Sequence, residues 1–124
     1  MAEIKVLLVD DDRAINFLNQ IILKDSGLNC TVDVALNGSE ALSVIKDKDV
    51  CPDVILLDIN MPVMDGFEFL ENLKEMGTCY NTTRVYMLTS SLRDSDREEA
   101  LAFDCVKSYL EKPLTAQMVA NILH

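Results

Sequence analysis

The chain has little histidine, little positive charge and no long apolar run, and each shortage argues against a class of function. Its single histidine, His124, is the last residue, whereas a Ser-His-Asp or Cys-His site needs a base held by packed surroundings. The chain has 11 Lys and Arg against 21 Asp and Glu, a net charge of −10, which disfavours direct binding to nucleic acid or anionic membranes. No signal peptide pattern and no run long enough to span a bilayer is present, so we expect a cytoplasmic protein.

The cysteines are few and widely spaced. No Cys-x-x-Cys pair occurs among them, which argues against a structural zinc site or a thioredoxin-like centre. In the cytosol we therefore expect reduced thiols at all four positions, Cys30, Cys51, Cys79 and Cys105.

What the chain does have is the composition of one globular domain. It contains 124 residues, of which 49% are hydrophobic and 26% charged. That size allows an ordinary core, and no repeat, low-complexity stretch or linker interrupts it. We therefore predict a single domain over residues 1–124.

Five short apolar runs alternate with helix-like segments. The runs cover residues 4–9, 31–35, 54–57, 85–88 and 106–111. They are rich in β-branched residues, and all except the second lack polar alternation. This pattern is typical of parallel strands buried on both faces. Because parallel crossovers are right-handed and helices must cover both faces, we predict an α/β doubly wound, three-layer (βα)5 sandwich. Its flavodoxin-like sheet has the order 2-1-3-4-5, with a switch point between the first and third strands.

Two helices call for specific predictions. In the first, apolar residues recur at helical spacing and predict an inward face made of Ala14, Phe17, Leu18, Ile21 and Ile22. The fourth, near residues 93–103, is acidic and has few apolar residues, so we expect it to be the least buried helix.

Polar residues follow four of the predicted strands at their carboxyl ends. Asp10 and Asp11 follow the first strand, Asp58 the third, Thr89 the fourth and Lys112 the fifth. The carboxyl ends of parallel strands meet at one edge, where ligands of α/β sheets gather. Three carboxylates there would repel one another, and Mg²⁺, which prefers oxygen ligands and retains open positions, would relieve the repulsion. The pattern predicts a nucleophilic Asp beside a cation, able to receive a phosphoryl group.

Four strings of residues carry a family resemblance beyond this pattern. They are Val6-Leu7-Leu8-Val9-Asp10-Asp11-Asp12, Leu57-Asp58-Ile59-Asn60-Met61-Pro62-Val63-Met64-Asp65-Gly66, Leu88-Thr89-Ser90 and Tyr109-Leu110-Glu111-Lys112-Pro113. In this order and spacing, the chain from about residue 4 resembles the receiver domain of bacterial two-component response regulators, of the stand-alone, chemotaxis-regulator-like type.

The resemblance implies a role for each site residue. Asp58 would be the phosphoacceptor, taking a phosphoryl group from a phosphohistidine on a sensor kinase or a phosphotransfer protein. Mg²⁺ would be held by Asp11 and Asp58 directly, by Asp10 mainly through water, and by the backbone carbonyl of Asn60. Lys112 would contact one phosphoryl oxygen, and Thr89 another. The peptide bond after Lys112 is usually cis in this family.

The resemblance also implies a switch. Phosphorylation would draw the Thr89 hydroxyl inward and let the ring of Tyr109 move into the space it leaves. The face formed by the fourth helix, fifth strand and fifth helix, roughly residues 92–124, would then change and be read by a downstream protein. Such a domain catalyses its own phosphorylation and dephosphorylation but is not a turnover enzyme.

Three alternatives remain at this stage. The domain could be a phosphorelay intermediate, or a degenerate receiver that binds partners without phosphorylation, although its acids, Thr89 and Lys112 are intact. A Mg²⁺-dependent phosphatase usually carries a general acid two residues after the nucleophile, where this chain has Asn60. The chain also departs from the family at Cys105, where Gly is common, so we expect Asp104 to take the left-handed conformation there.

Overall fold

A five-stranded parallel sheet forms the centre of the computed structural model, which describes residues 3–48 and 50–123. The strands lie in the predicted order β2-β1-β3-β4-β5. Their bounds are β1 (Ile4–Val9), β2 (Cys30–Ala35), β3 (Val54–Leu57), β4 (Arg84–Thr89) and β5 (Val106–Glu111). The helices are α1 (Arg13–Lys24), α2 (Gly38–Lys48), α3 (Gly66–Met76), α4 (Asp94–Leu101) and α5 (Ala116–Leu123).

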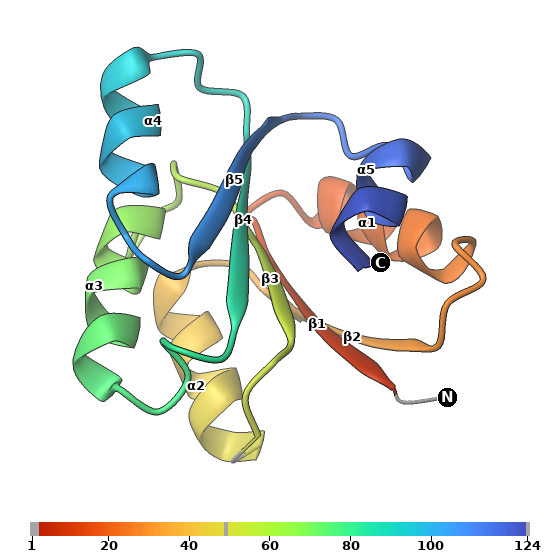
Figure 1. Cartoon of the computed structure of the whole chain (residues 1–124), viewed down its shortest axis with the longest axis horizontal. Helices are drawn as coiled ribbons and strands as arrows, with labels where there is room; N and C mark the ends of the chain where they lie inside the picture. The colour runs from red at the N-terminus through yellow and green to blue at the C-terminus, as the bar shows by residue number, and fades with distance from the viewer. Residues whose placement is uncertain (1–2, 49, 124) are drawn as a thin grey trace.

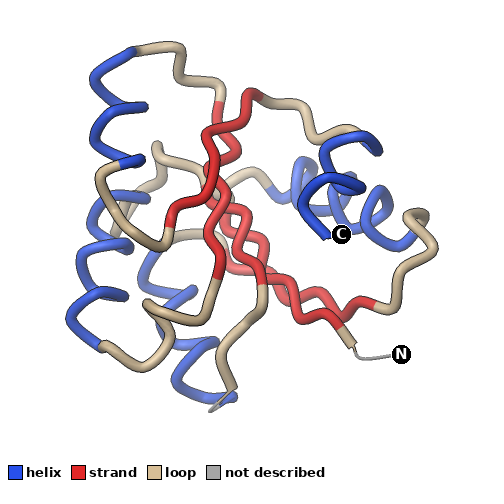
Figure 2. Tube along the Cα trace, in the orientation of Figure 1, coloured by secondary structure: helices blue, strands red, loops and turns tan. Residues whose placement is uncertain are grey.

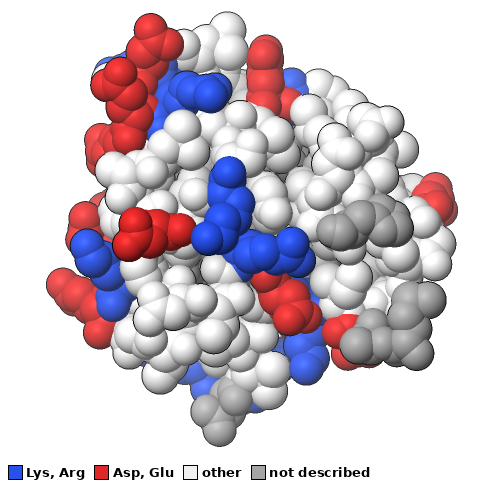
Figure 3. Space-filling model, viewed as in Figure 1, with Lys and Arg blue, Asp and Glu red and all other residues white. Residues whose placement is uncertain are grey.

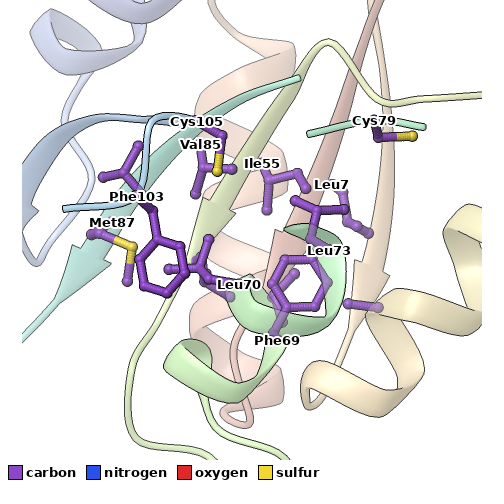
Figure 4. Packing of buried hydrophobic residues seen from close by; sticks show 14 of the residues in the cluster. Leu7, Ile55, Phe69, Leu70, Leu73, Cys79, Val85, Met87, Phe103 and Cys105 are labelled. Carbon is purple, nitrogen blue, oxygen red and sulfur yellow. The ribbon is translucent and has the colours of Figure 1, made fainter. Parts of the chain in front are cut away.

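The helices cover both faces of the sheet, as predicted for the doubly wound fold. Figure 1 shows α2, α3 and α4 on one face and α1 with α5 on the other, and Figure 2 shows the same layers by element type. Alternate side chains of β1 and β3 point to opposite faces. Leu7 and Ile55 therefore pack in the cluster under α2–α4, drawn in Figure 4 around Phe69 of α3, whereas Leu8 and Leu56 belong to the cluster under α1 and α5.

The prediction for the buried face of α1 is wrong for four of its five residues, since Ile22 alone among them packs, partly buried, against the core. Phe17, Leu18 and Ile21 are 62%, 56% and 41% exposed, whereas the residues that α1 buries are Asn16, Asn19 and Leu23. Asp12 caps the helix by accepting hydrogen bonds from the amides of residues 14 and 15. The inner face is tied to β1 by a hydrogen bond from Asn16 to the carbonyl of Asp10, and an apolar stripe of α1 faces outward.

The remaining helices follow the sequence more closely. Asp65 and Glu68 form a capping box at the start of α3, and Gly77, with a φ of 76°, ends it. The acidic helix α4 buries only Ala100, as expected; Figure 3 shows its acidic side chains gathered at the upper left of the molecule.

The expected left-handed conformation of Asp104 is not observed. Among the described residues, Val63 is the one non-glycine residue with a positive φ. Instead, the Asp104 amide donates to the Tyr80 hydroxyl at 2.9 Å.

The expectation of four reduced thiols is wrong for one pair. Cys51 before β3 and Cys79 after α3 form a disulfide across a Cα–Cα distance of 5.4 Å. Both residues lie in loops at the amino-terminal edge of the sheet, away from the strand ends that carry the acids. Cys30 and Cys105 are free, and burial raises the pKa of the Cys105 thiol to about 11.

We expect reduction of this disulfide to lower the free energy of unfolding by about 3 kcal/mol, since it closes a loop across 28 residues. Urea denaturation with and without a phosphine reductant measures the effect. The double variant Cys51→Ser/Cys79→Ser is the control and should be insensitive to the reductant. An unchanged midpoint for the wild type, with both thiols reactive from the start, would contradict the pairing.

Candidate functional site

Three carboxylates meet at the carboxyl edge of the sheet, as the sequence predicted. Leu57 of β3 pairs with Val9 of β1, so the residues that follow each strand are neighbours. Asp10 and Asp58 are buried, Asp11 is exposed, and one oxygen from each lies within 4.8 Å of the others. This donor set, with two inner acids and one facing solvent, fits a hard cation that keeps part of its water shell.

Lys112 supplies positive charge inside this cluster. Its Nζ lies 2.6 Å from Oδ2 of Asp10 and 3.0 Å from Oδ2 of Asp58. The backbone positions it, because the Lys112 amide donates to the carbonyl of Thr89 at 3.0 Å. The bond to Pro113 is cis, as the resemblance implied. The structure therefore brings Asp10, Asp11, Asp58 and Lys112 together.

Thr89 and Tyr109 are linked through Ser91. Thr89 is fully buried, and its Oγ1 accepts a hydrogen bond from the Ser91 amide at 3.2 Å. The Tyr109 hydroxyl donates to the Ser91 carbonyl at 3.1 Å, and the guanidinium of Arg97 lies 5.9 Å from the Tyr109 ring centre. A chain of contacts thus runs from the end of β4 through Ser91 to β5 and α4.

Comparison with known proteins agrees with this geometry. The family model for the response regulator receiver domain matches residues 6–124. The chain belongs to this family. A two-component response regulator from Cytophaga hutchinsonii superposes with a TM-score of 0.88 at 32% identity, covering 98% of this chain and 93% of that one. Chemotaxis protein CheY4 of Vibrio cholerae gives 0.81 at 34%, covering 98% and 97%.

Receiver sequences also occur inside longer relatives. Hybrid signal transduction histidine kinase G of Dictyostelium discoideum is 31% identical over 98% of this chain, which spans only 4% of that kinase. In the described residues of this receiver domain, no helix is both long and apolar enough to cross a bilayer. The family is a signalling domain rather than a turnover enzyme.

Burial and charge oppose each other in the site of this receiver domain. Burial raises the pKa of Asp10, and the nearby Asp58 adds to the effect, although hydrogen bonds from Lys112 and the Asp12 amide act against it. Burial alone would lower the pKa of Lys112, but its hydrogen bonds to Asp10 and Asp58 and their charges outweigh this and raise it. Lys112 therefore stays charged as the counter-ion of the two inner acids.

The loop after β3 holds Asp58 through its backbone. Oδ1 of Asp58 accepts from the Ile59 amide at 2.8 Å. The exposed Asn60 comes next, and the predicted cation-binding role of its carbonyl stays a prediction. Further along, Val63 has a φ of 69° and is 81% exposed, an unusual conformation for a β-branched residue.

Gly66 has a role that the sequence did not reveal. A Cβ on Gly66 would lie 2.5 Å from the Asp58 carbonyl oxygen and 3.0 Å from Cα of Ile59. Its amide also donates to the Ile59 carbonyl at 2.8 Å. Gly66 is therefore required for the close approach of the start of α3 to the backbone of Asp58, which a turn signal alone does not indicate.

We expect Gly66→Ala to lower the free energy of unfolding by about 2 kcal/mol, because the methyl group must displace the Asp58 backbone. It should also slow phosphorylation. Gly77→Ala is the matched control: no atom lies within 4 Å of its Cβ, so it should cost about 1 kcal/mol through its left-handed φ alone and leave phosphorylation unchanged. Urea denaturation and phosphorylation rates test both variants, and equal phosphorylation rates would contradict this role.

Proposed function

We propose that this receiver domain is a phosphorylation-activated signalling domain in which Asp58 accepts a phosphoryl group from a phosphohistidine. The observation that carries the proposal is the placement of Lys112 between Asp10 and Asp58, at 2.6 Å and 3.0 Å, beside the exposed Asp11. A carboxylate nucleophile, a fixed ammonium group and an oxygen-rich cation site are the parts that phosphoryl transfer requires.

In the proposed reaction, a carboxylate oxygen of Asp58 forms the new bond to phosphorus as the bond from phosphorus to the histidine nitrogen breaks. Lys112 would move its ammonium from Asp58 Oδ2 to a phosphoryl oxygen, and the Thr89 hydroxyl would donate to another. Mg²⁺, when held by Asp10, Asp11, Asp58 and the carbonyl of Asn60, would offset charge on the phosphoryl oxygens.

The contacts of Ser91 support a switch. If the Thr89 hydroxyl turns towards a phosphoryl group, it releases the Ser91 amide, and the carbonyl of Ser91 holds Tyr109. The half-buried Tyr109 would then repack, and α4, with Ala100 as its single buried residue, is free to adjust with it. We propose that the face of α4, β5 and α5 is read by a downstream protein.

We further propose that a histidine kinase or histidine phosphotransfer protein docks on the exposed stripe of α1. Phe17, Leu18 and Ile21 form this stripe, and it is continuous with the site because α1 begins directly after Asp12. The similarity to a hybrid histidine kinase supports a partner of this type. We propose that the domain meets this partner in the cytoplasm.

Substitution of the α1 stripe should slow phosphoryl transfer from a protein donor but not from a small-molecule donor. The donor is a histidine kinase that phosphorylates the wild type. We expect Phe17→Ser/Leu18→Ser to slow phosphotransfer from this kinase by about tenfold or more, as for the loss of central apolar contacts in an interface. Phosphorylation by acetyl phosphate should be unchanged. Leu101→Ser, on α4 and 40% exposed, is the control and should retain both reactions. Equal loss with acetyl phosphate would mean that the stripe acts on the site itself.

Intact-protein mass spectrometry after incubation with acetyl phosphate tests the main proposal. A phosphoryl-sized mass gain that requires Mg²⁺ and disappears with a chelator is expected. No gain, with beryllofluoride also failing to bind, would favour a domain that binds its partners without phosphorylation.

A further inference from the structure

A small cavity with both polar and apolar walls lies behind the acidic cluster, between α1 and the sheet. Asp10, Asn16, Asn19 and Asp58 line it together with apolar side chains of β1, β3 and β4. The space that the centre of a water-sized sphere can reach inside the cavity is about 10 Å³. On the same measure, this is close to the minimum that one water molecule needs. A cavity of this size, with four polar residues in its wall, is suited to a single water molecule.

Asn16 is the unusual part of this wall. It is only 2% exposed, and its Nδ2 donates to the backbone carbonyl of Asp10 at 2.8 Å. A carbonyl only accepts hydrogen bonds, so this contact fixes which end of the amide is nitrogen. The other end, Oδ1, is the one buried side-chain polar atom without a hydrogen-bond partner in the part of the chain described. An acceptor left unsatisfied costs about 1–3 kcal/mol.

The surrounding groups could satisfy a water molecule there. Asn19 is only 6% exposed and lines the same cavity. The carboxylates of Asp10 and Asp58 can accept further hydrogen bonds beyond those they make. Two to four polar partners are typical of a buried water molecule. Two adjacent turns of α1 therefore contribute amides to the wall, at positions where an apolar residue would fill the space.

We infer that Asn16 and Asn19 form a binding site for one buried water molecule, and that Asn16 is a positioning residue for Asp10. The water donates one hydrogen to Oδ1 of Asn16 and the other to a carboxylate oxygen of the acidic cluster. Asn16 then joins two parts of the site: its nitrogen holds the Asp10 backbone, and its oxygen holds the water behind the carboxylates. The consequence for cation binding rests on the proposed function.

The first test needs only the wild-type protein. Water-to-amide cross-relaxation in NMR should show a long-lived water molecule beside the Asn16 side-chain amide, with or without Mg²⁺. A high-resolution crystal structure should show it hydrogen-bonded to Oδ1. A dry cavity in both measurements would overturn the water site, whatever the domain does with phosphate.

The second test measures Mg²⁺ affinity by calorimetric titration. Asn16→Leu keeps the size of the side chain but removes both polar contacts, and we expect Mg²⁺ to bind about tenfold more weakly, as for outer partners of metal ligands. Asn121→Leu, an exposed residue of α5, is the control and should bind as the wild type does. Asn19→Ala, which keeps the Asn16 contact to Asp10, should have a smaller effect.

The outcomes separate this inference from the proposed function. If the wild type does not bind Mg²⁺, the proposed function fails while the water result still stands. Unchanged Mg²⁺ affinity in Asn16→Leu, with binding intact in the wild type, would overturn the positioning role. Should Asn16→Leu fail to fold, Asn16→Ala, which also removes both polar contacts, takes its place in the titration, and unchanged Mg²⁺ affinity there would overturn the positioning role.

Discussion

Asp58→Asn is expected to abolish the phosphoryl mass gain from acetyl phosphate. The amide oxygen of asparagine is too weak a nucleophile to replace the carboxylate. The substitution otherwise keeps the volume of the side chain and the backbone contacts around it. Lys112 also keeps its 2.6 Å ion pair with Asp10, so the fold should survive. Intact-protein mass spectrometry measures the result, and circular dichroism with urea denaturation verifies that the variant is folded.

The matched control for this experiment is Asp12→Asn. Asp12 lies two residues from Asp10 but caps α1, with its Oδ1 accepting from Ala14 and Ile15, and asparagine is an equally good N-cap residue. We expect Asp12→Asn to be phosphorylated at the wild-type rate. If Asp58→Asn gained a phosphoryl group as fast as the wild type, another carboxylate would be the acceptor and the proposed reaction would be wrong.

Lys112→Met is expected to damage both reactivity and stability. Without the ammonium group, phosphorylation should slow by roughly 10²–10³-fold, the usual effect of removing a charge-stabilising donor. The free energy of unfolding should fall by on the order of 3 kcal/mol, because Asp10 and Asp58 would remain buried without a counter-charge. Mg²⁺ should bind more tightly to the variant, since Lys112 no longer competes for the same carboxylates.

The pKa shifts of Lys112 and Asp10 predict how the stability difference between the wild type and Lys112→Met depends on pH. Lys112 has a raised pKa, so its stabilising contribution is complete below its ordinary value and is lost only as the pH rises through the higher folded value. The stability difference between wild type and Lys112→Met should therefore persist through neutral pH. It should narrow in acid, because Asp10, whose pKa is also raised, takes up a proton in the folded state and relieves the repulsion.

Lys107→Met is the control for Lys112→Met. Lys107 lies on β5, which leads to Lys112, but it is exposed, and its Nζ donates to the backbone carbonyl of Asp104 at 3.2 Å. Its loss should change stability by less than about 0.5 kcal/mol and leave Mg²⁺ affinity as it is. Equal Mg²⁺ affinity in Lys112→Met and the wild type would show that the ammonium and the cation do not share ligands.

The sequence predicted the parts of the fold in which burial alone decides the structure. Strands buried on both faces, such as Val54–Leu57, must be apolar throughout, so their position, their order and the polar residues at their ends could be found from pattern and chain topology. α1 could not be oriented in this way. Its most apolar face, with Phe17 and Leu18, points outward, whereas its inner face carries Asn16 and Asn19 beside the acids.

The features that the sequence missed depend on distances between residues far apart in the chain. Cys51 and Cys79 meet only because the loops before β3 and after α3 are neighbours. Gly66 reads as a turn residue until its distance from the Asp58 carbonyl is known. Analogy with glycine predicts a left-handed φ at Asp104, but its amide is held by Tyr80 from another loop.

The position of Lys112 in the chain also orders events during synthesis. This counter-ion lies 54 residues after Asp58, so at ribosomal rates it leaves the peptidyl-transferase centre roughly 3 to 11 s later. During that interval Asp10 and Asp58 lack Lys112, the lysine that pairs with them in the folded domain. Docking of β5 against β4 therefore brings the ammonium group to the carboxylates, so that completion of the sheet and neutralisation of its acidic edge are one event.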